Sequence, residues 1–111
     1  MRPDNPTLAA RLRARERQVT VGGHVFTIRR PKPAELVQPL AGLDLVQRFT
    51  VGWDLTNADL VRGGTPDPEP FDAVLFRDYI EDEPALWEPL GEAIMGLWRE
   101  HEAARADALK N

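Results

Sequence analysis

The acidic side chains are the first candidates for chemistry in this sequence. Five of them gather in a short stretch: Asp78, Glu81, Asp82, Glu83 and Glu88. Paired carboxylates can exchange protons with a substrate or bind divalent cations. This stretch also contains Pro84, a residue type that often begins a helix, and carboxylates beside a helix N-terminus are stabilised by its dipole. The spacing is not that of a calcium-binding loop, so we interpret the acids as helix-end residues and predict neither catalysis nor a metal site.

Nucleophiles and soft metal ligands are scarce in the chain. It has no cysteine and no serine, which removes disulfides, thiolate metal sites and the two commonest side-chain nucleophiles. His24 and His101 are too far apart in sequence to form a motif, so we interpret both as structural or solvent-facing. The glycine pairs at 22–23 and 63–64 are too short for a phosphate-binding loop. The sequence therefore predicts no enzyme and no cofactor.

Length and composition indicate one globular domain. The chain has 111 residues, of which 42% are hydrophobic and 29% charged, which is the ordinary range for a globular protein. No apolar run reaches the roughly 18–20 residues that span a bilayer. The N-terminus also lacks the apolar segment of a secretory signal. We therefore expect a cytosolic protein without a membrane partner.

The charges are unevenly distributed along the chain. Residues 1–50 hold nine Lys/Arg and four Asp/Glu, whereas residues 51–111 hold five and fourteen. A basic first half and an acidic second half favour head-to-tail self-association or an oppositely charged partner. The same distribution also fits two solvated surfaces with no role in binding.

A β-hairpin is the clearest local prediction. Two β-branched runs, 18–21 and 24–29, flank Gly22-Gly23, which supplies the positive φ angles of a tight turn. Pairing Val21 with His24 places Val19 opposite Phe26. Alternation along the strands then predicts an apolar face and a more polar one. The apolar face comprises Val19, Val21, Phe26 and Ile28, and the other comprises Thr20, Val25 and Thr27.

Several short helices are predicted after the hairpin. A turn at 34–38 precedes a helix of about 40–53 that ends near Trp53. Thr56 and Asp59 have capping-box spacing, which predicts a helix over 57–62 closed by the glycines at 63–64. The proline-rich segment that follows, up to Pro70, is predicted to be an exposed extended loop.

Two further helices are predicted towards the C-terminus. One begins after Asp72 as N-cap, with Phe71 packing against its first turn. Another begins at Pro84, and Pro89 is expected to bend it. Its apolar stripe is Leu86, Leu90, Ile94, Leu97 and Trp98.

These elements predict an α+β fold, mainly α, with the N-terminal hairpin packed on a bundle of about four helices. Residues 1–17 form an Arg-rich arm, predicted to be flexible, in which a helix over 8–17 would have Thr7 as N-cap. Residues 18–101 form the single hairpin-plus-helices domain. Residues 102–111 extend the last helix or fray, because they have little to bury.

The central part of the chain also contains a series of short motifs made of aromatic, proline and acidic residues. It runs Arg48-Phe49-x-Val51-Gly52-Trp53-Asp54, Asp59-Leu60, a Gly-rich turn, Pro70-Phe71-Asp72, and Asp82-x-Pro84-x-Leu86-Trp87-x-Pro89-Leu90. With the Pro-x-Pro-Ala segment at 31–34, this pattern resembles tail assembly chaperones of long-tailed (siphovirus-type) phages and prophages. The resemblance covers residues 18–98.

The resemblance implies a small chaperone that is not an enzyme, acts in the host cytoplasm and is absent from the finished virion. Such proteins bind the tape measure protein, keep its long apolar helices soluble and help to recruit tail tube (major tail) subunits. Family members tend to self-associate. Many exist in two forms that differ by a ribosomal frameshift, and this chain is similar to the short form.

Five apolar residues are the candidate partner-binding set: Phe49, Trp53, Phe71, Trp87 and Leu90. The tryptophans sit on apolar stripes, where core packing is the alternative interpretation. We predict a groove that accepts an amphipathic client helix, with Phe49 beneath the other four. The loop over 63–70 would be a packing hinge and a possible client surface.

Two other functions stay open at this stage. One is a structural phage component, such as a head–tail connector or a tail completion protein, which would remain in the virion. The other is a nucleic-acid-binding adaptor that uses the four arginines between 11 and 17. Two observations weigh against nucleic acid: no aromatic residue lies among these arginines, and the whole chain is acidic, with a net charge of −4.

Overall fold

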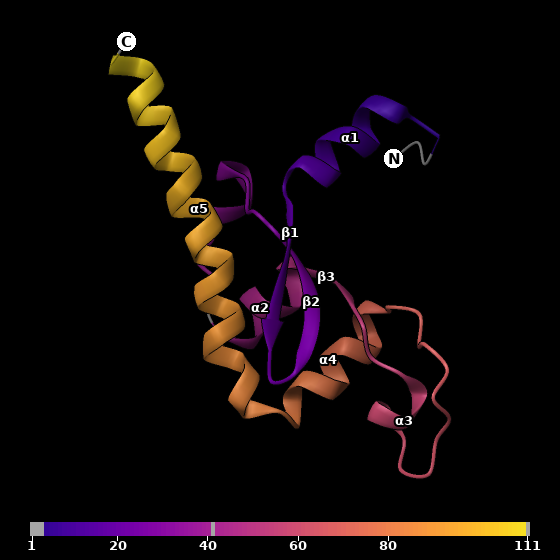
Figure 1. Cartoon of the computed structure of the whole chain (residues 1–111). Coiled ribbons are helices and arrows are strands. Elements are labelled where there is room, and N and C mark those ends of the chain that lie inside the picture. The colour runs from indigo at the N-terminus through magenta and orange to yellow at the C-terminus, as the bar shows by residue number, and fades with distance from the viewer. Residues whose placement is uncertain (1–3, 41, 111) are drawn as a thin grey trace.

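The computed structural model describes residues 4–40 and 42–110 (Figure 1). The predictions at 1–3, Ala41 and 111 lie outside these residues. The chain forms α1 (Pro6–Ala14), β1 (Glu16–Val21), β2 (His24–Arg29), α2 (Leu43–Phe49), β3 (Thr50–Trp53), α3 (Asn57–Leu60), α4 (Ala73–Glu81) and α5 (Trp87–Lys110). Short 3₁₀ turns at Pro33–Leu36 and Pro84–Leu86 precede α2 and α5.

The predicted hairpin is confirmed. Strands β1 and β2 pair antiparallel with Val21 opposite His24 and Val19 opposite Phe26. Gly22 and Gly23 have φ angles of 61° and 81°, which a two-residue hairpin turn requires and which glycine adopts without strain. Phe26 is fully buried on the apolar face.

The predicted helix over 40–53 is wrong in its second half. Helix α2 ends at Phe49, and Thr50–Trp53 forms a third strand, β3, beside β2 in the sheet order β1-β2-β3. Trp53 pairs with Phe26 and Gly52 with Thr27. A Cβ atom at Gly52 would lie 3.1 Å from the Cβ of Thr27, so this close pairing favours glycine. Leu36, Leu40, Leu43 and Val46 recur at helical spacing, which favoured the longer helix. Sheet pairing, a long-range contact, ends it at Phe49.

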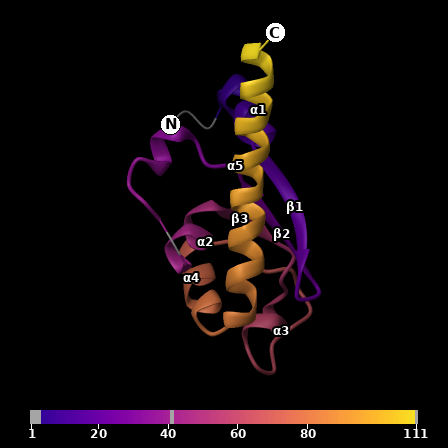
Figure 2. The same ribbon diagram turned by 90° about the vertical axis from the view of Figure 1, so that its left-hand side faces the viewer.

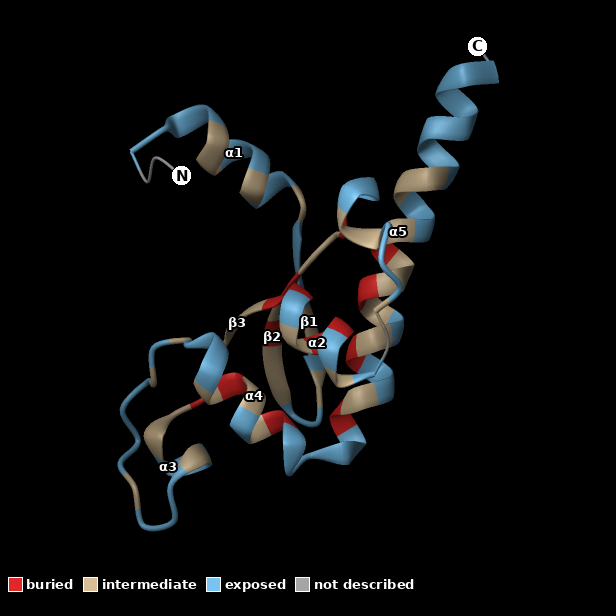
Figure 3. Ribbon diagram, turned by 180° about the vertical axis from the view of Figure 1, so that it is seen from behind, coloured by how far each residue is buried: buried red, intermediate tan, exposed pale blue. Residues whose placement is uncertain are grey.

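Helices α2, α4 and α5 cover one face of the sheet and close the core. Figure 3 shows the buried residues concentrated where these helices face the strands. The helical part of this core comprises Leu45, Val46, Phe49, Phe76, Ile80, Leu86, Leu90, Ile94 and Leu97. The mixed α+β class is confirmed, but a bundle of four helices is not. Helix α3 is one turn long, and α1 has no buried residue and projects from the sheet (Figure 1).

Two predicted helix starts are confirmed, those capped by Thr56 and Asp72. Thr56 and Asp59 form a reciprocal capping box at α3. The Asp72 carboxylate accepts the Leu75 N–H at 2.9 Å at the start of α4. The rings of Phe71 and Phe76 lie 5.7 Å apart, which is the predicted packing of Phe71 against the first turn.

Other predicted helix bounds need correction. The helix predicted over 8–17 ends at Ala14, because Glu16 and Arg17 belong to β1, and the helix predicted from residue 40 begins at Leu43. The N-cap of α1 is Asn5, whose side chain accepts the Leu8 N–H, because the helix begins at Pro6 and so includes the expected Thr7 cap. Helix α3 ends at Leu60, short of the predicted residue 62. Pro89 is the third residue of α5, where a backbone N–H has no helical partner, so the reason for a bend disappears.

The C-terminal residues continue α5 as a helix through Lys110. Figure 2 shows α5 running past the sheet and beyond the rest of the domain. Residues 103–110 are exposed. Of the two predictions for residues 102–111, extension of the last helix or fraying, the structure shows the extension over the described residues.

Candidate partner-binding surface

The structure divides the five predicted partner-binding residues between two regions and the core. Phe49 and Leu90 are fully buried. Phe49 thus lies beneath the surface as predicted, whereas Leu90 is a core residue and is not available for direct contact with a partner. Trp53 and Phe71 lie together beside α4, and Trp87 lies at the start of α5. The five residues therefore do not form one continuous groove.

The first region is a group of four aromatic residues, the Trp53 cluster: Trp53, Phe71, Phe76 and Tyr79. Trp53 meets Phe71 edge to face with ring centroids 5.1 Å apart, and Tyr79 at 6.2 Å. Its indole N–H donates to the Glu69 carbonyl at 2.7 Å. Edge-to-face rings and a satisfied indole are features of a packed interior. The cluster fastens the segment before α4 to the sheet.

The predicted hinge loop is held by backbone hydrogen bonds. The Asn57 N–H donates to the Asp67 carbonyl at 2.9 Å, and the Ala58 N–H to the Thr65 carbonyl at 2.8 Å. The Asn57 side chain also accepts the Thr65 N–H at 3.0 Å. Gly63 has a φ angle of 76°, which closes the turn. The loop is exposed as predicted, but these bonds make it a fixed connection.

The second region is an open, largely apolar groove between the start of α5 and the segment around α2. We call it the α5 groove. Its volume is about 500 Å³, and its lining residues are Leu40, Gly42, Leu45, Trp87, Glu88, Gly91, Glu92 and Met95. Trp87 is fixed by its indole N–H, which donates to the Ile80 carbonyl at 2.6 Å.

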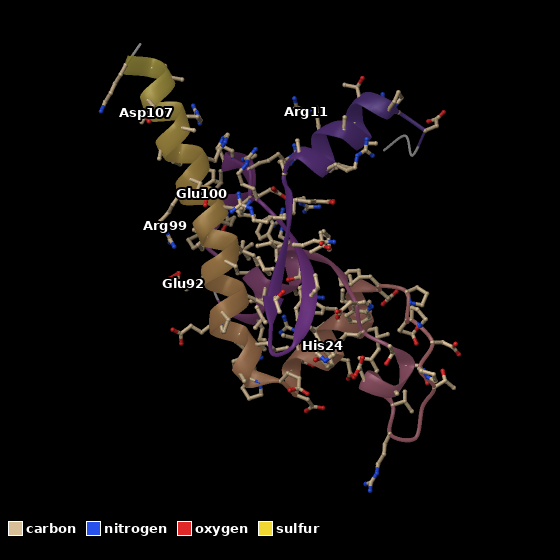
Figure 4. All side chains as sticks on the ribbon, viewed as in Figure 1. Arg11, His24, Glu92, Arg99, Glu100 and Asp107 are labelled. Carbon is tan, nitrogen blue, oxygen red and sulfur yellow. The ribbon has the colours of Figure 1, made fainter. Side chains whose placement is uncertain are left out.

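The floor and rim of the α5 groove differ in chemistry. Gly91 leaves space, because a Cβ atom there would meet only the Val46 Cγ2 at 3.9 Å. The rim carries Glu88 and Glu92, and Glu92 pairs with Arg99 at 3.4 Å on the outer side of α5 (Figure 4). The groove can therefore accept apolar side chains from a partner that brings positive charge to its edge.

Sequence reasoning missed most of the α5 groove. It identified Trp87 but not Leu40, Leu45 or Met95. A signal was present on α5, since Trp87, Gly91 and Met95 recur every four residues and share one helix face. No comparable signal joins them to residues 40–45, because that contact depends on how α2 packs against α5.

In the acidic stretch around Pro84, Glu81 has a structural contact, an ion pair with Arg77. Arg77 pairs with Asp44 at 3.0 Å and with Glu81 at 3.2 Å, and these hydrogen bonds raise the pKa of Arg77. Burial, followed by nearby carboxylates such as Glu83, raises the pKa of Tyr79. Within residues 4–40 and 42–110, no group of three His, Cys, Asp or Glu side chains is placed to hold a metal ion.

The histidines have structural contacts. His24 Nδ1 lies 3.3 Å from an Asp54 oxygen and its Nε2 4.0 Å from Asp59, so it links the hairpin turn to α3. Hydrogen bonds from the Thr56 backbone and then its hydroxyl lower the pKa of Asp59. The His101 ring lies 6.2 Å from Trp98 on α5.

Comparison of the chain with protein-family models, curated proteins and solved structures finds no significant match. In the described part of the chain, none of the helices is both long and apolar enough to cross a membrane. Function therefore has to be argued from the surface itself and from the residue pattern.

Proposed function

We propose that this chain is a phage or prophage tail assembly chaperone of the short form. It binds the tape measure protein, keeps it soluble and helps to recruit tail tube subunits. It acts in the host cytoplasm without catalysis and leaves before the virion is complete. The observation that carries the proposal is the α5 groove, an open apolar surface of the kind that a chaperone needs for a helical client. The residue pattern over 18–98 supports it independently.

The dimensions of the α5 groove suit one face of an amphipathic helix. Its volume is about 500 Å³, and most of its exposed lining is apolar. The lining positions on α5 run from Trp87 to Met95, which is slightly more than two helical turns. A client helix crossing these turns inserts apolar side chains spaced three and four residues apart.

The acidic rim sets a requirement on the client. Glu88 and Glu92 flank the apolar floor, so a client helix with Lys or Arg beside its apolar stripe is favoured. Such pairs at a solvated rim contribute more to association rate and selectivity than to affinity. Client capture is therefore expected to weaken as salt is raised, while the apolar contacts persist.

A matched pair of glycine substitutions on α5 tests the proposal. Gly91→Leu fills the α5 groove, whereas Gly96→Leu adds the same side chain where nothing lies within 4 Å. Both replace glycine by a better helix former, so both variants are expected to fold. Each is co-expressed with the tape measure protein, and the soluble client is measured. We expect Gly91→Leu to weaken client affinity about tenfold and to lower the yield of soluble client by a similar factor. Gly96→Leu is expected to leave the yield unchanged.

Two results would refute this function. One is equal client solubility with both variants and with the unaltered chain. The other is detection of the chain in purified virions by mass spectrometry at a fixed copy number, which a head–tail connector or tail completion protein predicts.

A further inference from the structure

Two arginines face each other where the hairpin ladder ends. The register of β1 and β2 places Glu16 opposite Arg29, so the next pair is Arg15 with Arg30. The Arg30 N–H donates to the Arg15 carbonyl at 2.8 Å, which extends the ladder by that pair. Like charges directly opposite each other on paired strands are destabilising. The fold therefore holds two guanidinium groups together at a cost in stability.

These two arginines line a pocket of about 250 Å³ between the α1–β1 junction and α5. The other lining residues are Ala14, Glu16, Arg17, Leu97, Glu100 and His101. Helices α1 and α5 diverge from this end of the sheet (Figure 1). Glu100 is on the part of α5 that faces β1, as Figure 4 shows.

The positive charge in this pocket is only partly neutralised. Glu100 is engaged by Arg17, whose two terminal nitrogens lie 3.0 and 3.3 Å from its carboxylate oxygens. Arg30 donates to the Pro31 carbonyl, a neutral group, at 3.0 Å. The Nε of Arg15 is buried with no hydrogen-bond partner among the described residues. A buried charged donor without a partner costs stability, which adds to the cost of holding the two arginines together.

The electrostatics of Arg30 agree with this geometry. Burial lowers the pKa of Arg30, the charge of Arg15 lowers it further, and Glu35 partly offsets both. Glu35 itself is shared with Arg29 at 3.6 Å and Arg48 at 3.7 Å. The Arg15–Arg30 pair is therefore short of negative charge.

We propose that this pocket binds a phosphate group, either free phosphate or a phosphomonoester. Three arginines and two glutamates, Glu16 and Glu100, line the pocket, so its lining carries net positive charge. A phosphate group presents at least three acceptor oxygens to the Arg15 and Arg30 guanidinium groups, whereas a carboxylate presents two. Guanidinium groups bind phosphate oxygens through paired N–H donors, and such charge-assisted bonds are among the strongest in proteins. The anion converts the repulsion between Arg15 and Arg30 into attraction. His101 forms the opposite wall on α5.

Phosphate titration of the full chain tests the site. Amide chemical shifts are followed by NMR at constant ionic strength, with inorganic phosphate as the probe. We expect saturable shifts near Arg15, Arg30 and His101 with a half-saturation on the order of 1 mM. A second arm uses glycerol phosphate, which tells whether a phosphomonoester binds more tightly than the free ion. Acetate at the same ionic strength is the carboxylate control.

Matched charge removals separate a pocket from general attraction. Arg15→Gln and Arg30→Gln are each expected to weaken phosphate binding at least about tenfold. Arg13→Gln removes the same charge from an exposed position on α1 outside the pocket and is expected to have no effect. Without phosphate, Arg30→Gln is expected to melt at the same temperature as the unaltered chain or higher, because it relieves the like-charge pair.

Three results would overturn the proposal. The first is shifts that grow linearly with phosphate and never saturate. The second is a response to acetate equal to that with phosphate. The third is equal weakening by Arg13→Gln and Arg15→Gln, which would show attraction to the basic half of the chain as a whole.

Discussion

Trp53 and Trp87 have the same local chemistry but different surroundings. Both are half-buried, and both donate the indole N–H to a backbone carbonyl, at 2.7 Å to Glu69 and at 2.6 Å to Ile80. Trp53 is then enclosed by the rings of its cluster. Trp87 instead borders the α5 groove.

The difference shows how an aromatic residue is committed either to the fold or to a partner. Around Trp53, the ring faces and edges are occupied by other side chains of the same chain, so little is left to bind. Around Trp87, glycine at position 91 leaves apolar surface that none of the described residues covers. Residue type and spacing do not distinguish the two tryptophans, but packing does.

Replacing each tryptophan by alanine gives the largest expected contrast. Trp53→Ala removes three ring contacts and leaves the Glu69 carbonyl without its donor, so we expect a loss of about 3 kcal/mol in unfolding free energy. Trp87 borders open space, so Trp87→Ala is expected to lower the unfolding free energy by a smaller amount, about 2 kcal/mol. Urea unfolding followed by circular dichroism measures both values.

The two variants are expected to affect client binding in the opposite order, with the larger loss in Trp87→Ala. The folded fraction of Trp53→Ala is expected to retain client binding, whereas Trp87→Ala loses it. If Trp53→Ala removes client binding and Trp87→Ala does not, the assignment of the two regions is reversed.

The sequence predicted what local contacts determine. The Gly22-Gly23 hairpin, the Thr56 capping box and the packing of Phe71 on α4 each depend on residues within a few positions of one another. Strand β3 was missed because its pairing with β2 joins residues far apart in the sequence, such as Phe26 and Trp53, which no local pattern reveals.

The two surface sites were missed for the same physical reason. The α5 groove joins Leu40, Gly42 and Leu45 to the first turns of α5, and the pocket at Arg15 and Arg30 joins the hairpin end to α5. A groove is also defined partly by what is absent, here a side chain at Gly91. The Arg15–Arg30 pair follows from the hairpin register once that register is extended by one residue.

A smaller effect separates the two regions through pH. Thr56→Ala removes the α3 cap beside the Trp53 cluster and is expected to cost about 1 kcal/mol. The pKa of Asp59 is depressed in the folded chain, so its contribution is present above about pH 4 and is lost as pH falls through the folded pKa. The sensitive window therefore lies below about pH 4.

Amide exchange and shifts of residues 56–60 followed from pH 6 to pH 2.5 check this effect. We expect α3 to loosen before the lining of the α5 groove changes, and to loosen at higher pH in Thr56→Ala. Simultaneous loss of both regions would contradict the separation between them.

The smallest expected effect is at Gly91. Gly91→Ala adds a methyl group at ordinary contact distance, 3.9 Å from the Val46 Cγ2, and removes the conformational freedom of glycine inside α5. Both changes favour the folded state, so we expect a gain of about 0.5–1 kcal/mol, the same as for Gly96→Ala. Client capture distinguishes the two, because only the methyl group at 91 occupies the α5 groove. If Gly91→Ala is more stable yet retains less client, the empty space at position 91 serves client binding, and the glycine there costs stability. Equal client retention by Gly91→Ala and Gly96→Ala, together with equal gains in stability, would mean that the space at 91 has no part in binding.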